Sequence, residues 1–138
     1  MEPIRLSLCL AMIIALAAAC GHSPSAGSAR TVRTVEISNQ VNPHVIYASP
    51  GEEVRWTNAR QNPVRVGFLN MRLMEDPQCQ NGIVDVFGQM NDHVTIEPGE
   101  SISLCPAKTD DLQYNVWFEP ENPRGAISPT LTIKIRGG

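Results

Sequence analysis

Apolar residues occupy every second position in one segment after another from Val32 to the end of the chain. Successive side chains of a strand point to opposite sides, so this alternation predicts strands with one buried face. Pro, Gly, Asn or Asp separates each segment from the next. The segments cover residues 32–37, 45–47, 53–57, 64–68, 94–96, 102–104, 112–118 and 131–135. No stretch after residue 31 sustains a helical period, which predicts an all-β domain.

About eight strands with one apolar face each must bury those faces against a second sheet, which predicts a sandwich or a small barrel. Residues 31–138 are enough for one domain with one core. Pro50-Gly51 and Pro98-Gly99 are expected to be turns between strands. The segment 71–92 breaks the alternation and is predicted to be a long crossover between the sheets.

Several short motifs in this pattern resemble signatures of the cupredoxins. They are a strand preceded by Asn-Pro, a V-x-W-x-N strand that follows a glycine turn, a P-G-E turn, and a strand that contains an aromatic residue. These motifs occupy residues 42–47, 50–58, 96–101 and 112–114. The resemblance extends over residues 31–135, nearly all of the predicted domain. It implies a cupredoxin-like, Greek-key β-sandwich of about eight strands.

The resemblance also draws attention to a copper site whose ligands are missing. A type 1 centre requires two imidazoles and one thiolate around the metal. Val64 or Arg65 takes the place of the first histidine, and Val116 takes the place of the cysteine. The loop 117–125 contains neither histidine nor methionine. We therefore expect a domain without type 1 copper and without another cofactor.

A nonstandard copper site is the alternative that the sequence leaves open. Thioether and imidazole ligands suit Cu(I), so a Cu(I) store or chaperone can be built from the soft ligands of the chain. The candidates are Met71, Met74, Met90, His44 and His93. Their spacing matches no recognised metal motif, and methionines in an irregular crossover typically fill gaps in a core.

The first twenty residues resemble the signal and lipobox of bacterial lipoproteins. Arg5 precedes an apolar stretch that is too short to span a bilayer, and small residues lead directly to Cys20. The resemblance implies that residues 1–19 are removed and that Cys20 carries acyl chains such as palmitate. Residues 20–30 then form a flexible linker. Gly21, in place of an aspartate, favours the outer membrane facing the periplasm. The alternative is an ordinary secretory signal with a chance cysteine.

Two cysteines remain in the predicted domain once Cys9 and Cys20 are set aside. They are Cys79 and Cys105, in a chain that the signal sends to an oxidising compartment. A disulfide between them is the default expectation. Free thiols and soft metal ligands are the alternatives.

Composition argues against two further classes of function. The formal net charge is −3 and the basic residues are scattered, so nucleic acid is not an expected partner. The chain has no G-x-S-x-G motif, and its paired acids at 52–53, 75–76 and 110–111 fall at expected turns. We therefore do not expect an enzyme.

Trp117 and Arg124 are the candidate recognition residues. Trp117 has the opposite parity to its apolar neighbours, so its indole is predicted to point outward near the 119–129 loop. Exposed Trp and Arg are favoured anchors in interfaces, although Trp117 packed beneath this loop is an equal alternative. Arg55 and Arg65 are expected to form surface ion pairs with acids such as Glu53 and Glu36. Together these features predict a membrane-anchored envelope protein that binds a partner protein or serves as an accessory structural module.

Overall fold

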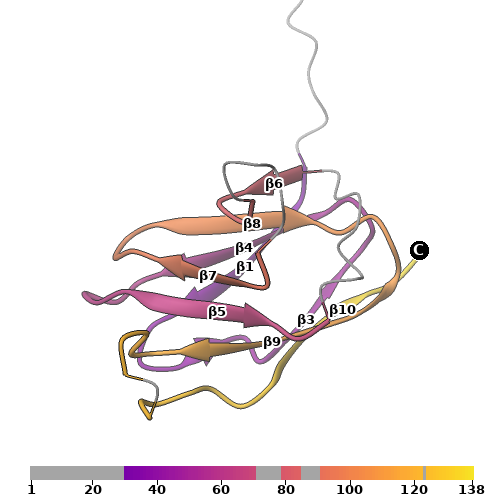
Figure 1. Cartoon of the computed structure of the whole chain (residues 1–138). Coiled ribbons are helices and arrows are strands. Elements are labelled where there is room, and N and C mark those ends of the chain that lie inside the picture. Colours follow the sequence, from indigo (N-terminus) through magenta and orange to yellow (C-terminus); the bar gives the residue numbers. More distant parts are fainter. Residues whose placement is uncertain (1–29, 71–78, 85–90, 123) are drawn as a thin grey trace, which may run out of the picture.

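The computed structural model describes residues 30–70, 79–84, 91–122 and 124–138, and it forms two five-stranded sheets (Figure 1). The first sheet has the order β2-β1-β4-β8-β6, and the second has the order β3-β10-β9-β5-β7. The strands are β1 (Val32–Ile37), β2 (Val41–Asn42), β3 (Val45–Ala48), β4 (Glu53–Asn58), β5 (Val64–Phe68), β6 (Cys79–Asn81), β7 (His93–Ile96), β8 (Ser101–Cys105), β9 (Asp110–Trp117) and β10 (Leu131–Ile135). Two pairs, β1 with β4 and β3 with β10, are parallel, and the other named pairs are antiparallel.

The all-β sandwich expected from the alternation is confirmed, and each of the eight expected segments contains a strand. The turns at Gly51 and Gly99 are also present, with φ angles of 83° and 77° that a glycine adopts without strain. Two strands were not expected. β2 has only two residues, and β6 has the sequence Cys-Gln-Asn, so neither shows an apolar alternation. Nowhere in the described ranges does a helix occur that is long and apolar enough to cross a membrane.

The segment between β5 and β7 crosses between the sheets, as expected, and returns. β5 and β7 are neighbours in the second sheet, whereas β6 lies at the edge of the first sheet beside β8. Cys79 and Cys105 are directly opposite each other in the β6–β8 pair, and the structure joins them in a disulfide. This bond ties the middle of the crossover to a strand whose cysteine is fully buried.

The core lies between the sheets and is centred on three aromatic rings. Trp56 packs edge-on against Phe68 at 5.3 Å and against Tyr114 at 5.6 Å between ring centroids. Burial raises the pKa of Tyr114 to about 12, although the neighbouring Trp56 indole acts in the opposite direction. Among the described residues, neither Trp56 Nε1 nor Tyr114 Oη has a partner at standard hydrogen-bond geometry. Burial in the core keeps the phenol in its neutral form.

Asn58 organises one end of the sandwich. Its side chain is fully buried, and its Nδ2 donates to the backbone oxygens of Asn62 and Ile96 at 2.9 Å each. Its Oδ1 accepts from the backbone N–H of Arg60 at 2.9 Å. One amide therefore fixes the connection after β4 against the end of β7. Beside it, the Arg60 guanidinium lies 5.1 Å from the centre of the Phe118 ring, which follows β9.

Candidate functional site

The interior positions that the resemblance assigns to copper ligands are occupied by valines. The structure decides the choice left open at the first of them, because Val64 is fully buried whereas Arg65 lies on the outer face of the second sheet. Val116 is also fully buried. Valine has no donor atom, so these positions do not fit a centre that requires imidazole and thiolate ligands. We derive no electron-transfer step for this chain.

The histidines of the alternative copper site lie far apart. His44 immediately precedes β3, and His93 begins β7, so they lie at opposite edges of the second sheet. Four strand spacings separate these edges, a distance of about 19 Å. His93 Nδ1 instead contacts Asp92 Oδ1 at 2.6 Å. Among the residues that the structure describes, no group of three or more His, Cys, Asp or Glu side chains could hold a metal ion.

Several sequence predictions fall on residues outside the described ranges. Met71, Met74 and Met90 lie there, as do Cys20 with the signal segment 1–19 and all but the last residue of the linker 20–30. The lipid anchor and the methionine ligands therefore remain predictions.

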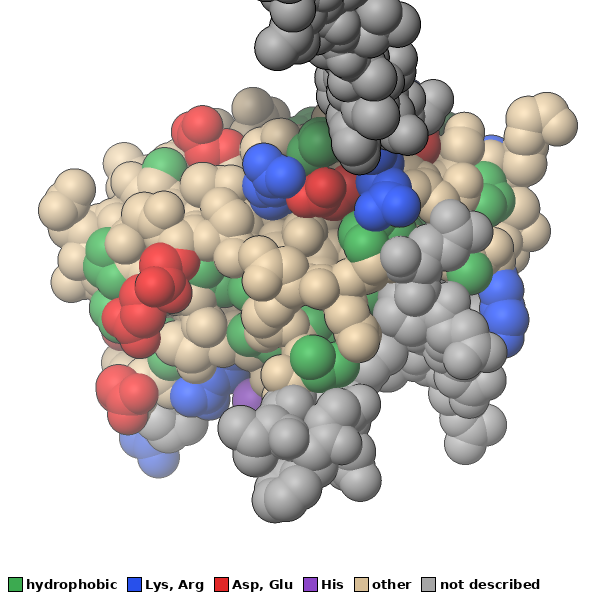
Figure 2. Space-filling model, turned by 90° about the horizontal axis from the view of Figure 1, so that it is seen from above, with side chains coloured by type: hydrophobic (Ala, Val, Ile, Leu, Met, Phe, Trp, Pro, Cys, Tyr) green, Lys and Arg blue, Asp and Glu red, His purple; other side chains and the backbone are tan. Residues whose placement is uncertain are grey.

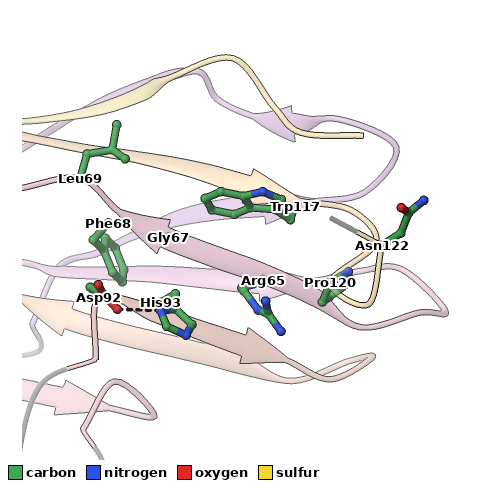
Figure 3. A pocket seen from close by; sticks show the side chains of 9 residues that line it. All are labelled: Arg65, Gly67, Phe68, Leu69, Asp92, His93, Trp117, Pro120 and Asn122. Carbon is green, nitrogen blue, oxygen red and sulfur yellow. Dashed lines mark hydrogen bonds and ion pairs between the residues drawn. The ribbon is translucent and has the colours of Figure 1, made fainter. Parts of the chain in front are cut away.

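A recess of about 400 Å³ opens on the outer face of the second sheet, next to Trp117 (Figure 3). We call it the Trp117 recess. Its polar lining comes from Arg65 on β5, from Asp92 and His93 at the start of β7, and from Asn122 in the loop after β9. Its apolar lining includes Trp117, Leu69 and Pro120 over the glycine of β5. Residues from three segments that are distant in sequence thus meet around one indole.

Gly67 allows the Trp117 indole to lie against the sheet. A Cβ atom built on Gly67 would lie 2.4 Å from a carbon of the indole, far inside van der Waals contact. The ring consequently packs with one side on the backbone of β5, and Trp117 is half-buried rather than free in solvent. The prediction that the indole points out of the core is correct.

Arg65 belongs to this recess and not to an ion pair with Glu36. The two residues lie in different sheets, because Glu36 is on β1 of the first sheet. Arg65 is instead the cross-strand neighbour of Trp117. Its Nε is buried without a hydrogen-bond partner, and its side chain forms no ion pair with any described residue. The expected Arg55–Glu53 pair is present at 2.6 Å, although it runs along β4 and not across strands.

A second recess, of about 300 Å³, lies at the end of the sandwich organised by Asn58. We call it the loop-end recess. Phe118 and Arg60 line it together with Glu119, Glu121 and Asn122. Pro120 and Asn122 line both recesses, so the loop after β9 separates them. Glu119 and Glu121 are exposed, which gives the recess an acidic rim around its aromatic ring and guanidinium.

The two candidate recognition residues line no common recess. Trp117 lines the recess that is named after it, whereas Arg124 is exposed in the loop and lines neither the Trp117 recess nor the loop-end recess. The backbone N–H of Arg124 donates to Asn122 Oδ1 at 3.1 Å, and Asn122 lines the loop-end recess, so Arg124 lies next to that recess.

Sequence reasoning did not identify Gly67, Arg60 and Phe118 as site residues. A glycine inside a strand is a signal for close approach, and Gly67 carried that signal.

Figure 2 shows the surface of the molecule that faces upward in Figure 1. Acidic and basic side chains are interspersed on this surface, with hydrophobic side chains scattered between them. The Glu52 carboxylate accepts from Arg33 at 3.2 Å and from the backbone N–H of Ser49 at 2.8 Å. These two contacts lower the pKa of Glu52 below its usual range, with Arg33 the larger cause.

No protein-family model matches the chain, and no curated protein is similar to it in sequence. Solved structures do resemble it. A Cu(I) amicyanin variant superposes with a TM-score of 0.50 at 14% identity, covering 76% of this chain and 82% of amicyanin. A second, reduced amicyanin variant gives 0.50 at 13% identity with the same two coverages. A purple cupredoxin from Nitrosopumilus maritimus has a TM-score of 0.48 at 14% identity and covers 75% of this chain and 98% of its own. The amicyanin likeness confirms the cupredoxin-like fold.

Proposed function

We propose that this protein is a lipid-anchored accessory module of the bacterial cell envelope, which binds a partner protein and does not use type 1 copper. The loop-end recess is the observation that carries the proposal. Interfaces concentrate aromatic side chains and arginine at their centre and polar side chains at their rim. Phe118 with Arg60 supplies such a centre, and Glu119 and Glu121 supply such a rim. Arg124 extends this surface with an exposed positive charge.

The anchor makes a modest interface sufficient. Acylation of Cys20 would hold the domain close to the membrane through the short linker 20–30. A partner on the same membrane then meets the domain at a high effective concentration, so the interface needs less affinity of its own. The residue after the anchor, Gly21, supports the outer membrane facing the periplasm as the location.

Two measurements test the anchor and the copper-free assignment. Cys20→Ala should abolish acylation and release the protein from the membrane fraction, and a variant that stays membrane-bound contradicts the lipoprotein proposal. Titration of the purified chain with Cu(I) should show no stoichiometric binding. Binding that Met71→Leu or His93→Ala weakens would favour the copper-handling alternative instead.

The partner surface is tested with charge reversals that leave the core untouched. Full-length protein is cross-linked in membranes, and the products of Glu121→Lys and Arg124→Glu are compared with those of the wild type. Both side chains are exposed, so the fold should be unaffected. Glu36→Lys is the matched control, because it reverses an exposed charge on the first sheet.

We expect one cross-linked product that the wild type and the Glu36→Lys control both form and that the two loop-end variants lose. Products that are identical for all four proteins would show that the loop-end recess does not bind a partner.

A further inference from the structure

The Trp117 recess is lined by an indole ring that packs against the second sheet. One side of the indole packs on Gly67, where there is no side chain to tilt the ring. The ring also lines the recess, so part of its surface faces the opening (Figure 3). An aromatic face carries partial negative charge and attracts the weakly positive hydrogens of C–H groups laid against it. An indole that lines an open recess in this way offers a surface on which a ligand ring can stack.

Hydrogen-bonding groups of both kinds surround this surface. Arg65 contributes guanidinium donors, and its buried Nε has no hydrogen-bond partner among the described residues. Asp92 contributes carboxylate oxygens, with its side chain 74% exposed and one oxygen in contact with His93.

The Asn122 amide also lines the recess. Its Nδ2 donates to Glu119 and its Oδ1 accepts from the backbone N–H of Arg124, which leaves one N–H and one lone pair for a ligand. These groups come from β5, from the start of β7 and from the loop after β9. A ligand stacked on Trp117 would thus find planar polar groups around its edge.

Next to the recess, the outer face of the second sheet carries uncharged polar side chains. Asn115 and Thr95 are the cross-strand neighbours of Gly67 and Arg65, and Gln113 is paired with Thr132. The centre of a protein–protein interface is more apolar than this. A ligand rich in hydroxyl groups can replace the water on these amide and hydroxyl side chains with hydrogen bonds of its own, so the cost of desolvation is small. An apolar protein surface would bury the same side chains without replacing those hydrogen bonds.

We propose that the Trp117 recess is a saccharide-binding site. A pyranose ring presents a face of C–H groups, which stacks on the indole, and an edge of hydroxyl groups, which bond to Arg65, Asp92 and Asn122. The volume of about 400 Å³ lies within the range of small-ligand sites. The loop after β9 separates this site from the proposed partner surface, and different variants test the two. Either proposal can therefore be refuted without the other.

Indole N–H signals in NMR spectra give a direct test, because the chain has only two tryptophans. The full-length chain is purified in a detergent without a sugar headgroup. It is titrated with cellohexaose, maltohexaose, chitohexaose and a galacturonic acid hexamer. We expect at least one of these oligosaccharides to shift the Trp117 signal saturably. The Trp56 signal should stay in place, because that ring is fully buried in the core.

Two variants separate stacking from general damage to the fold. Trp117→Ala should lower the affinity about tenfold, which lies within the range of losses found when nucleic-acid bases lose an aromatic stacking partner. Gly67→Ala should do the same without removing any group that touches the sugar, because its Cβ displaces the ring. An unchanged Trp56 signal in both variants shows that the core is intact. Arg124→Glu is the matched control and should retain full affinity.

The proposal is wrong if none of the four oligosaccharides shifts the Trp117 signal. It is also wrong if they bind equally well to the Gly67→Ala variant. A shift caused by a decaproline peptide but by no oligosaccharide would assign the recess to a protein segment instead.

Discussion

The Cys79–Cys105 disulfide is predicted to supply a large part of the stability of the domain. It joins residues 26 apart in sequence, and the loop-closure entropy removed from the unfolded chain by such a bond corresponds to about 3.5 kcal/mol. Small domains unfold with only 5–15 kcal/mol in total, so reduction should be strongly destabilising. For a domain of this size the same change lowers the melting temperature by about 15–25 °C.

Urea unfolding of the full-length protein, followed through the buried Trp56, measures this difference between the oxidised and reduced forms. Reduction keeps both sulfur atoms in place, whereas Cys105→Ala would also leave a cavity at a fully buried position. The Cys79→Ala/Cys105→Ala double variant serves as the control, because reductant should not affect it. A reduced protein within about 1 kcal/mol of the oxidised form would refute the argument that the bond acts by constraining the unfolded chain.

Three further predictions follow from buried and paired groups. Asn58→Asp should cost at least about 2 kcal/mol in urea unfolding, because it removes both Nδ2 donors and buries a charge, whereas a loss below about 0.5 kcal/mol would contradict the role of Asn58. Tyr114 has its pKa raised to about 12, so the stability that it contributes is complete below its unfolded pKa of about 10 and is lost as the pH rises toward 12. Tyr114→Phe should remove that alkaline transition from a spectrophotometric titration. Glu52 has a lowered pKa, so its contribution should be lost as the pH falls below the usual carboxyl range. Arg33→Ala should raise the Glu52 pKa in an NMR titration and cost less than about 1 kcal/mol, because the pair is partly exposed and screened.

The apolar alternation was sufficient to predict eight of the ten described strands. It failed for β2 and β6, which are held by their neighbours and not by an apolar face of their own. β6 lies in the sheet because it pairs with β8 and because the Cys79–Cys105 disulfide links the two strands. Neither cause can be predicted from the local sequence Cys-Gln-Asn.

The candidate sites were only partly predictable. The parity of Trp117 correctly placed it outside the core, but parity does not reveal which residues from other strands surround it. Arg65 was expected to pair with an acid, and the structure instead places it beside the indole. Arg124 was grouped with Trp117 because both lie near one loop in sequence, yet the two line no common recess.

The sequence by itself determined the fold class, the buried face of most strands and the absence of a histidine or cysteine at residues 64, 65 and 116. Each of these follows from residue type and a period of two, which are local properties. Only the tertiary structure decided that Gly67, Arg65, Asp92 and Asn122 meet at Trp117, and that His44 and His93 lie at opposite edges of one sheet. Strand order and register bring distant residues together, and both are set by the packing of the whole sandwich rather than by any single segment.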